Sequence, residues 1–253
     1  MKGLILKDLM CLRKQLIIFG YVVFGVLVVS IMYVMSARFG NIALAGGKLL
    51  TDQGLSAFDV VNIAKLAQVM FMLLPIATVG DMANVFAEDG RAGFTKVASV
   101  LPLSIRQRVM ARYITIFAMF GIGVAVDLLI AFTLSLLTDM ISFGELLGII
   151  ISAASVMSIY SAMVIAFCIL LGYGREQYAT LLSVGIIAVA GIGLNFPKIK
   201  GILLDQGTGG ELLKSFMNFI GHKSYVLLII AVITIVLSFA ASVAIADRKR
   251  GRM

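Results

Sequence analysis

The sequence has few charged residues for its length. Only 13% of its 253 residues are charged, whereas 61% are hydrophobic, and a globular domain usually carries about a quarter charged residues. A soluble core cannot absorb that much apolar surface, but a lipid bilayer can. The composition therefore predicts an all-α integral membrane protein. The net charge of +8 is then a matter of membrane topology, and we expect no nucleic-acid partner.

The side chains that most catalytic sites need are also scarce. The one histidine, His222, excludes a Ser/His/Asp arrangement, and the two cysteines, Cys11 and Cys168, have no metal-ligand spacing and predict no disulfide. The nearest approach to a nucleotide-binding loop fails because Leu49 follows Lys48, where such a loop needs Ser or Thr for magnesium. We expect no catalytic residue, no cofactor and no metal ion in this chain, which is not an enzyme by itself.

Six apolar stretches are each long enough to cross the bilayer, and together they predict a single transmembrane domain over residues 1–253. Residues 1–14 mix basic and apolar side chains, which predicts an interfacial helix. Residues 197–223 are too apolar for a solvated loop and too short to cross twice, which predicts interfacial or re-entrant helices on the outer side of the membrane. The predicted spans cover about residues 15–35, 59–83, 113–136, 145–171, 179–196 and 224–246.

The basic residues set the predicted orientation. Every arginine except Arg38 falls in a segment that six spans place on the cytoplasmic side when both termini are cytoplasmic. Lys and Arg are retained on that side of membranes. An odd number of spans would put one basic terminus outside.

Three charged residues fall in or near the predicted spans. Asp127 lies near the middle of the third span, where an ionised carboxylate is costly, and Gly123 and Ala131 share its helical face, which predicts contact with other helices. Asp127 either contacts a cationic substrate or relays protons, or it bonds to a neighbouring helix and holds the bundle together. Asp81 and Lys65, at opposite ends of the second span, are further pathway candidates; the alternatives are pairing with an arginine for Asp81 and snorkelling for Lys65.

The longest cytoplasmic segment, residues 84–112, has more structure than a connector needs. The sequence predicts a short helix over Ala92 to Val100, an interruption at Pro102, and a capping residue at Ser104 for the helix that enters the third span. This arrangement suits docking of a cytosolic partner. The candidate docking residues are Glu88, Asp89, Arg91, Phe94, Lys96, Val97, Val100, Leu101 and Pro102.

At this loop the chain resembles the permease subunits of ABC-2 type transporters. The resemblance lies in the opening MKGLILKDL, in FAEDG at residues 86–90, in ASVLPLS at residues 98–104, and in the Arg112–Tyr113 pair. The sequence departs from the family pattern at Val100 and at Ile105, where a basic residue is common. Short chains of this type include bacterial exporters of phenol-soluble modulin peptides and of bacteriocins.

The resemblance implies a mechanism as well as a fold. Residues 1–14 would be an elbow helix on the inner leaflet, the region from Phe94 to Val100 a coupling helix, and residues 197–223 the extracellular re-entrant helices. Two permease chains, identical or different, would pair with two separate subunits that bind ATP and magnesium. The complex would export amphipathic peptides or hydrophobic compounds across a bacterial cell membrane. The alternative is a proton-coupled secondary transporter or channel that uses Asp127.

Overall fold

The computed structural model describes residues 2–39, 67–80, 83–91, 104–137, 142–172, 174–204 and 224–250. Within these ranges every regular element is a helix and no strand occurs, which confirms the predicted all-α class. The helices are α1 (Lys2–Cys11), α2 (Arg13–Phe39), α5 (Leu74–Gly80), α6 (Ala83–Arg91), α8 (Ile105–Leu137), α9 (Phe143–Leu171), α10 (Glu176–Leu204) and α12 (Ser224–Arg250).

Four helices in the described ranges are long and apolar enough to cross a membrane. They are Arg13–Met35 of α2, Ile105–Leu137, Phe143–Leu171 and Ser224–Arg248 of α12, and they coincide with the predicted first, third, fourth and sixth spans. Two shorter apolar helices, Ala67–Thr78 and Glu176–Gly191, occupy the places of the predicted second and fifth spans. The protein is therefore a multi-helix membrane protein.

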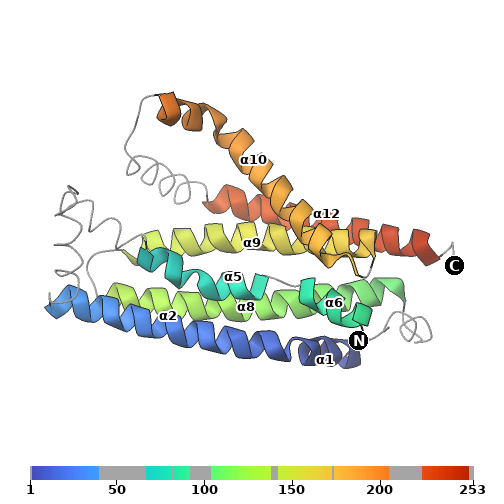
Figure 1. The fold of residues 1–253 in the computed structure, drawn as a ribbon, viewed down its shortest axis with the longest axis horizontal. Helices are drawn as coiled ribbons and strands as arrows, with labels where there is room; N and C mark the ends of the chain where they lie inside the picture. Colours follow the sequence, from blue (N-terminus) through green and yellow to red (C-terminus); the bar gives the residue numbers. More distant parts are fainter. Residues whose placement is uncertain are drawn as a thin grey trace.

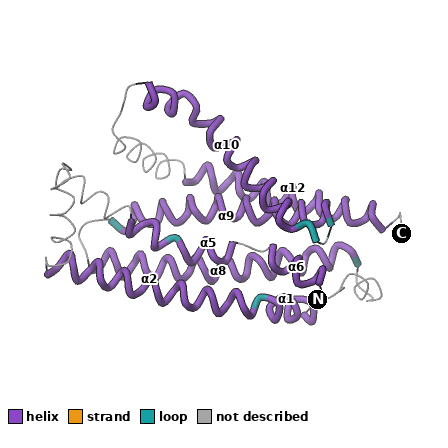
Figure 2. Tube along the Cα trace, viewed as in Figure 1, coloured by secondary structure: helices purple, strands orange, loops and turns teal. Residues whose placement is uncertain are grey.

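The long helices run side by side with α8 and α9 at the centre (Figures 1 and 2). Helix α9 packs against α12, α10, α8 and α5, and α8 packs against α5, α9, α1, α12 and α2. Large apolar side chains remain exposed along α2, α10 and α12, including Phe24, Leu181 and Leu237. In a membrane protein such side chains face lipid or a neighbouring membrane-embedded chain, because lipid tails are as apolar as they are. Helix α10 leans away from the bundle toward its C-terminal end (Figure 1).

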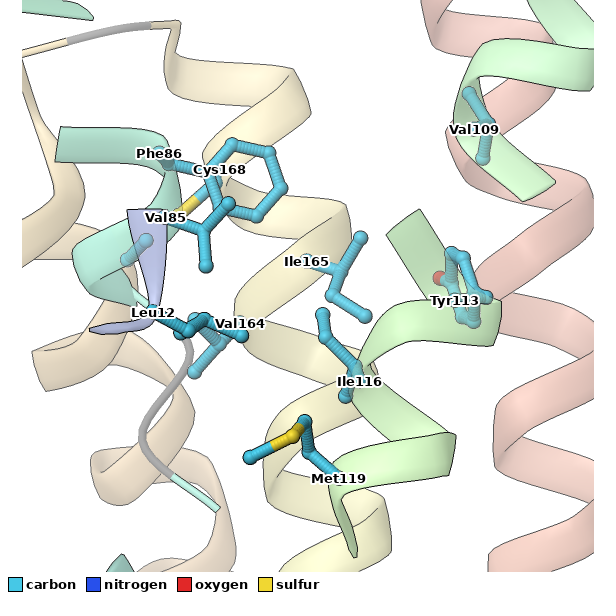
Figure 3. Packing of buried hydrophobic residues seen from close by; sticks show 11 residues of the cluster. Leu12, Val85, Phe86, Val109, Tyr113, Ile116, Met119, Val164, Ile165 and Cys168 are labelled. Atoms are coloured by element: carbon cyan, nitrogen blue, oxygen red, sulfur yellow. The ribbon is translucent and has the colours of Figure 1, made fainter. Parts of the chain in front are cut away.

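In the ranges that the structure describes, two clusters of buried apolar side chains form the core. The first lies at the end of the bundle that holds α1 and α6, where Leu12 and Phe86 pack with Val164, Ile165 and Cys168 of α9 and with α8 (Figure 3). The second lies farther along the bundle. It joins α2, residues 69–76, α8 and α9 through Val26, Val69, Met72, Ile76, Phe120, Ile130, Ala131, Leu134, Leu146, Ile149 and Ile150.

Serine residues cap two of the long helices, as their sequence predicts for Ser104. The Ser104 hydroxyl accepts a hydrogen bond from the Gln107 amide at 3.2 Å, and the Gln107 side chain accepts one from the Ser104 amide at 3.1 Å. Ser142 and Glu145 form the same reciprocal arrangement at the start of α9. Each pair satisfies backbone donors that have no partner within the helix. The Ser104 cap sets the start of α8 eight residues before the predicted span.

Pro75 and Pro197 affect their helices differently. The apolar helix after residue 66 is interrupted by a turn at Leu73, two residues before Pro75, which separates residues 67–72 from α5; the kink itself stays a prediction. At Pro197 the prediction is wrong, because α10 continues through this residue to Leu204 and does not end at residue 196. A proline removes one backbone hydrogen bond, which a transmembrane helix tolerates.

A hydrogen-bonded group joins α8, α9 and α12. The Tyr113 hydroxyl lies 2.6 Å from the Ser238 hydroxyl and 3.3 Å from that of Ser242. Ser238 donates its own proton to the Ala162 carbonyl at 2.5 Å, so Tyr113 is the donor to Ser238. The Phe239 ring meets the Tyr113 ring edge-on, with centroids 5.5 Å apart.

Replacing the tyrosine tests this connection. Tyr113→Phe keeps the ring but removes the hydroxyl, so we expect the free energy of unfolding to fall by about 1 kcal/mol. The measurement is the thermal unfolding midpoint of the purified chain in detergent. Thr234→Val is the control, because Thr234 is exposed on α12 and bonds only to the carbonyl of Ile230 in its own helix. Equal midpoints for both variants would contradict the prediction.

Candidate functional site

Four charged side chains from three helices meet at the end of the bundle that holds α1 and α6. Lys7 and Asp8 come from α1, Asp89 from α6 and Arg112 from α8. Asp8 is 0% exposed, Asp89 1% and Arg112 7%. We call these four residues the charge cluster.

The charges of the cluster alternate in space. The Lys7 ammonium lies 2.5 Å from Asp89 Oδ1 and 3.1 Å from Asp8 Oδ1. The Arg112 guanidinium pairs directly with Asp89 Oδ2, and its Nη1 lies 3.6 Å from Asp8 Oδ1. Each cation therefore contacts both anions, and the formal charges cancel. A buried charge without such a partner would be strongly destabilising.

Apolar and aromatic side chains surround the cluster. The Arg112 guanidinium lies over the Phe86 ring, 4.9 Å from its centroid, and Phe86 belongs to the first core cluster (Figure 3). An arginine on an aromatic face gains a cation–π attraction in addition to its ion pairs. The low polarity around the cluster also strengthens the attraction between its charges.

Lys7 is the member of the cluster closest to solvent, with 24% of its side chain exposed. Partial burial lowers the pKa of Lys7 below its usual range, and the nearby Arg112 lowers this pKa further, while Asp8 acts in the opposite direction. The two carboxylates are what keep an ammonium group favourable at this position. Lys7 thus depends on these two carboxylates for its charge.

Local sequence places each member. Helix α8 begins at the Ser104 cap, so Arg112 lies about two turns inside it, level with α1. Asp89 lies near the end of α6, on the same side as the buried Val85 and Phe86. The spacing of three and four residues puts these side chains on one helical face. The cluster is therefore built from the segments that carry the resemblance: the opening, FAEDG and the Arg112–Tyr113 pair.

The structure divides the predicted docking residues. Glu88 and Arg91 pair with each other at 3.0 Å with 44% and 76% of their side chains exposed, whereas Asp89 faces into the chain. Phe94, Lys96, Val97, Val100, Leu101 and Pro102 lie outside the described residues, as do Asp81 and Lys65. The docking role of this segment stays a prediction.

Sequence reasoning did not find the cluster. The sequence predicts a docking role for Asp89, an interfacial helix around Lys7 and a place for Arg112 in the family resemblance, but no contact among these residues. No local pattern shows that Lys7 and Asp89, separated by 82 residues, are in contact. The one sequence signal that points to the cluster is the family resemblance. Two of its motifs, the opening and the FAEDG segment, each contain an aspartate of the cluster next to apolar residues.

Asp127 lies in a separate, apolar environment. It is 0% exposed on α8, about 22 Å along the helix from Arg112, with the second core cluster around it. Its burial confirms that this face of α8 contacts other helices. Its carboxyl group faces the backbone of Ile76, but neither oxygen accepts a hydrogen bond of ordinary geometry. In the part of the chain that the structure describes, no three His, Cys, Asp or Glu residues gather as metal ligands.

Long apolar helices with a compact charged end define an integral membrane protein whose polar chemistry is concentrated at one end of the bundle. Residues 56–248 match the sequence pattern of a family described as ABC-2 family transporter protein. Since this match covers well over half of the chain, the chain belongs to that family. Members are membrane transport components that typically pair with an ATP-binding subunit. No curated protein and no solved structure matches the chain.

The neutrality of the charge cluster gives a sharp prediction. Asp89→Asn and Arg112→Gln each leave the cluster with a net charge, so each should lower the free energy of unfolding by about 3 kcal/mol. The double variant keeps the Lys7–Asp8 pair and is neutral again. We expect it to be more stable than the sum of the two single effects predicts.

Thermal unfolding of all four forms in detergent measures this coupling. Glu88→Gln is the matched control, because it removes a neighbouring but exposed ion pair and should change stability by less than about 1 kcal/mol. Strictly additive effects of the two single changes would show that Asp89 and Arg112 do not act as a pair.

Proposed function

We propose that this chain is the permease subunit of an ATP-driven exporter that moves amphipathic peptides or hydrophobic compounds, with ATP bound and hydrolysed by a separate subunit. Family membership supports the transport role. The observation that carries the mechanism is the charge cluster, which ties α6 to α1 and α8. Helix α6 ends at Arg91, immediately before the predicted coupling helix.

The cluster gives a route for force from the partner subunit. If that subunit moves residues 92–100, α6 moves with them, because the two segments are adjacent in the chain. Asp89 then pulls on Arg112 of α8 and on Lys7 of α1 through close ion pairs. The ends of these helices would move as one body, since breaking the pairs would leave buried charges.

The proposed topology has six spans and two cytoplasmic termini in a bacterial cell membrane. Four long helices and two shorter apolar ones supply the spans. Helix α1 and the end of α12 lie at the same end of the bundle (Figure 1), as an even number of spans requires. Helix α1 would then be the elbow helix on the inner leaflet.

An apolar groove along α10 supports the substrate class. It has a volume of about 990 Å³ and lies beside Tyr178, Leu181, Leu182, Ile186 and Val189, with Arg175 at one end. A long apolar surface next to one cationic side chain suits a molecule that is hydrophobic along its length and polar at one end. In the complex, two such chains would line the pathway. Family membership favours this function over the alternative of a proton-coupled secondary transporter or channel.

Partner docking provides the main test. Phe94→Asp should abolish co-purification of the ATP-binding subunit and the ATP hydrolysis stimulated by the permease, because a charge would replace an apolar contact of the coupling helix. Leu136→Ala is the control, because Leu136 is exposed near the far end of α8. An aspartate there would place a charge on the lipid face, so alanine is used. Partner binding that survives both Phe94→Asp and removal of residues 90–104 would refute the proposal.

The topology can be tested with single cysteines after Cys11 and Cys168 are replaced by serine. We expect a membrane-impermeant maleimide to label Lys48→Cys and Lys214→Cys in intact cells, because both positions lie on the proposed outer side. Arg175→Cys and Arg252→Cys should be labelled only after the cells are opened. Labelling of Arg252→Cys in intact cells would contradict the two cytoplasmic termini.

A further inference from the structure

A carboxylic acid and a broken helix face each other inside the bundle. Asp127 of α8 is fully buried, and its carboxyl group faces the backbone of Ile76 in α5. Ile76 lies three residues after Leu73, where the apolar helix is broken, and one residue after the buried Pro75. The site is thus formed by a polar side chain on one helix and an irregular piece of backbone on the next.

The break leaves backbone groups that need partners. The Ile76 amide belongs to the first turn of α5, where amides have no acceptor within their own helix. Pro75 has no N–H, so the carbonyl of Phe71 loses its usual α-helical donor. In an apolar setting both a free donor and a free acceptor are costly. Asp127 is the polar side chain that faces this break.

The surroundings of Asp127 do not favour an ionised carboxylate. Val69, Met72, Ile76, Ile130 and Ala131 of the second core cluster are all buried around this part of α8. In the described part of the chain, no cationic side chain pairs with Asp127. Tyr33 of α2 is the titratable side chain that packs against the same cluster. The buried polar residues Gln68 and Ser30 are neutral and bond to each other at 2.8 Å.

We propose that Asp127 is a proton-binding site, and that the neutral acid holds the broken second apolar helix against α8. A protonated carboxyl group has one acceptor oxygen for the Ile76 amide and one O–H donor for a backbone carbonyl of the break. An ionised carboxylate has no donor and would be an unpaired charge among apolar side chains. Only the protonated form satisfies both kinds of backbone group.

Release of the proton would loosen the contact between α5 and α8. The O–H bond breaks, its electron pair stays on the carboxylate, and the proton passes to water that enters as the two helices separate. Helix α5 is followed by α6, which carries Asp89. On the proposed transport function, movement of α6 would therefore change the proton occupancy of Asp127. Proton binding itself does not depend on that function, and the tests below do not use the partner subunit or ATP.

Infrared spectroscopy tests the protonation state directly. At neutral pH the purified chain in lipid nanodiscs should show the carbonyl stretch of a protonated carboxylic acid, and Asp127→Asn should lose it. Asp247→Asn is the matched control, because Asp247 is an acidic residue at the end of α12 outside this cluster, and its variant should keep the band. Absence of any protonated-acid band in the unmodified chain would overturn the proposal, whether or not the variants fold.

Thermal unfolding tests the role of the proton in the helix contact. Raising the pH from neutral to strongly alkaline should remove the proton, so the unmodified chain should lose stability as the pH rises. The asparagine side chain also supplies one donor group and one acceptor and does not ionise. Asp127→Asn should therefore have the same unfolding midpoint as the unmodified chain at neutral pH. At alkaline pH its midpoint should fall less, because it lacks the part of the decline that Asp127 causes.

Asp127→Leu separates hydrogen bonding from packing. Leucine supplies apolar contact but no hydrogen bond to the break, so its midpoint should lie several degrees below that of Asp127→Asn at neutral pH. An alkaline decline as large in Asp127→Asn as in the unmodified chain would refute the role of the proton. A leucine variant as stable as the asparagine variant would refute the hydrogen bonds to the break.

Discussion

Charged side chains can be buried at one end of this bundle only because their opposite charges cancel. Lys7, Asp8, Asp89 and Arg112 cancel one another, and each cation contacts both carboxylates. Lys7 and Asp8 of α1 form one ion pair and Asp89 of α6 and Arg112 of α8 form another, and the contacts of Lys7 with Asp89 and of Arg112 with Asp8 join the two pairs. The relative positions of these three helices therefore follow from one electrostatic requirement. The aromatic ring of Phe86 and the apolar cluster around it make that requirement stricter, since they exclude the solvent that would otherwise screen the charges.

The charge cluster and Asp127 both show that a buried polar group needs a partner, but they meet this need in different ways. Near α1 and α6, charges satisfy one another. At Asp127 no cation is in contact among the described residues, and the carboxyl group faces the backbone of Ile76 just after the break at Leu73. The helix that contains the break leads into the helix that carries Asp89. A displacement that begins at the charged end would thus reach the second site through a segment that is already irregular.

Much of the fold could be predicted from the sequence, because hydrophobic length and helix caps are local signals. Helices long and apolar enough to cross a membrane occur where the first, third, fourth and sixth spans are predicted, and the Ser104 cap is confirmed. The end of α10 was not predictable from Pro197, since a transmembrane helix accommodates proline when neighbouring groups compensate. The charge cluster was not predictable at all from spacing, because Lys7 and Asp89 meet only through tertiary packing. The burial of Asp127 was predictable from the small residues on its helical face, but its position opposite a helix break was not.

The long sequence separation within the charge cluster also bears on how the protein is made. A ribosome synthesises Lys7 and Asp8 with the first helix, but Asp89 follows Lys7 by 82 residues, and Arg112 comes later still. During that interval α2 can enter the membrane while α1 has only its own internal pair, at 3.1 Å, to offset its charges. Helix α1 can take its final place only after the start of α8 has emerged. Completion of the cluster therefore marks a late step in biogenesis, at which the earliest part of the chain is joined to its middle.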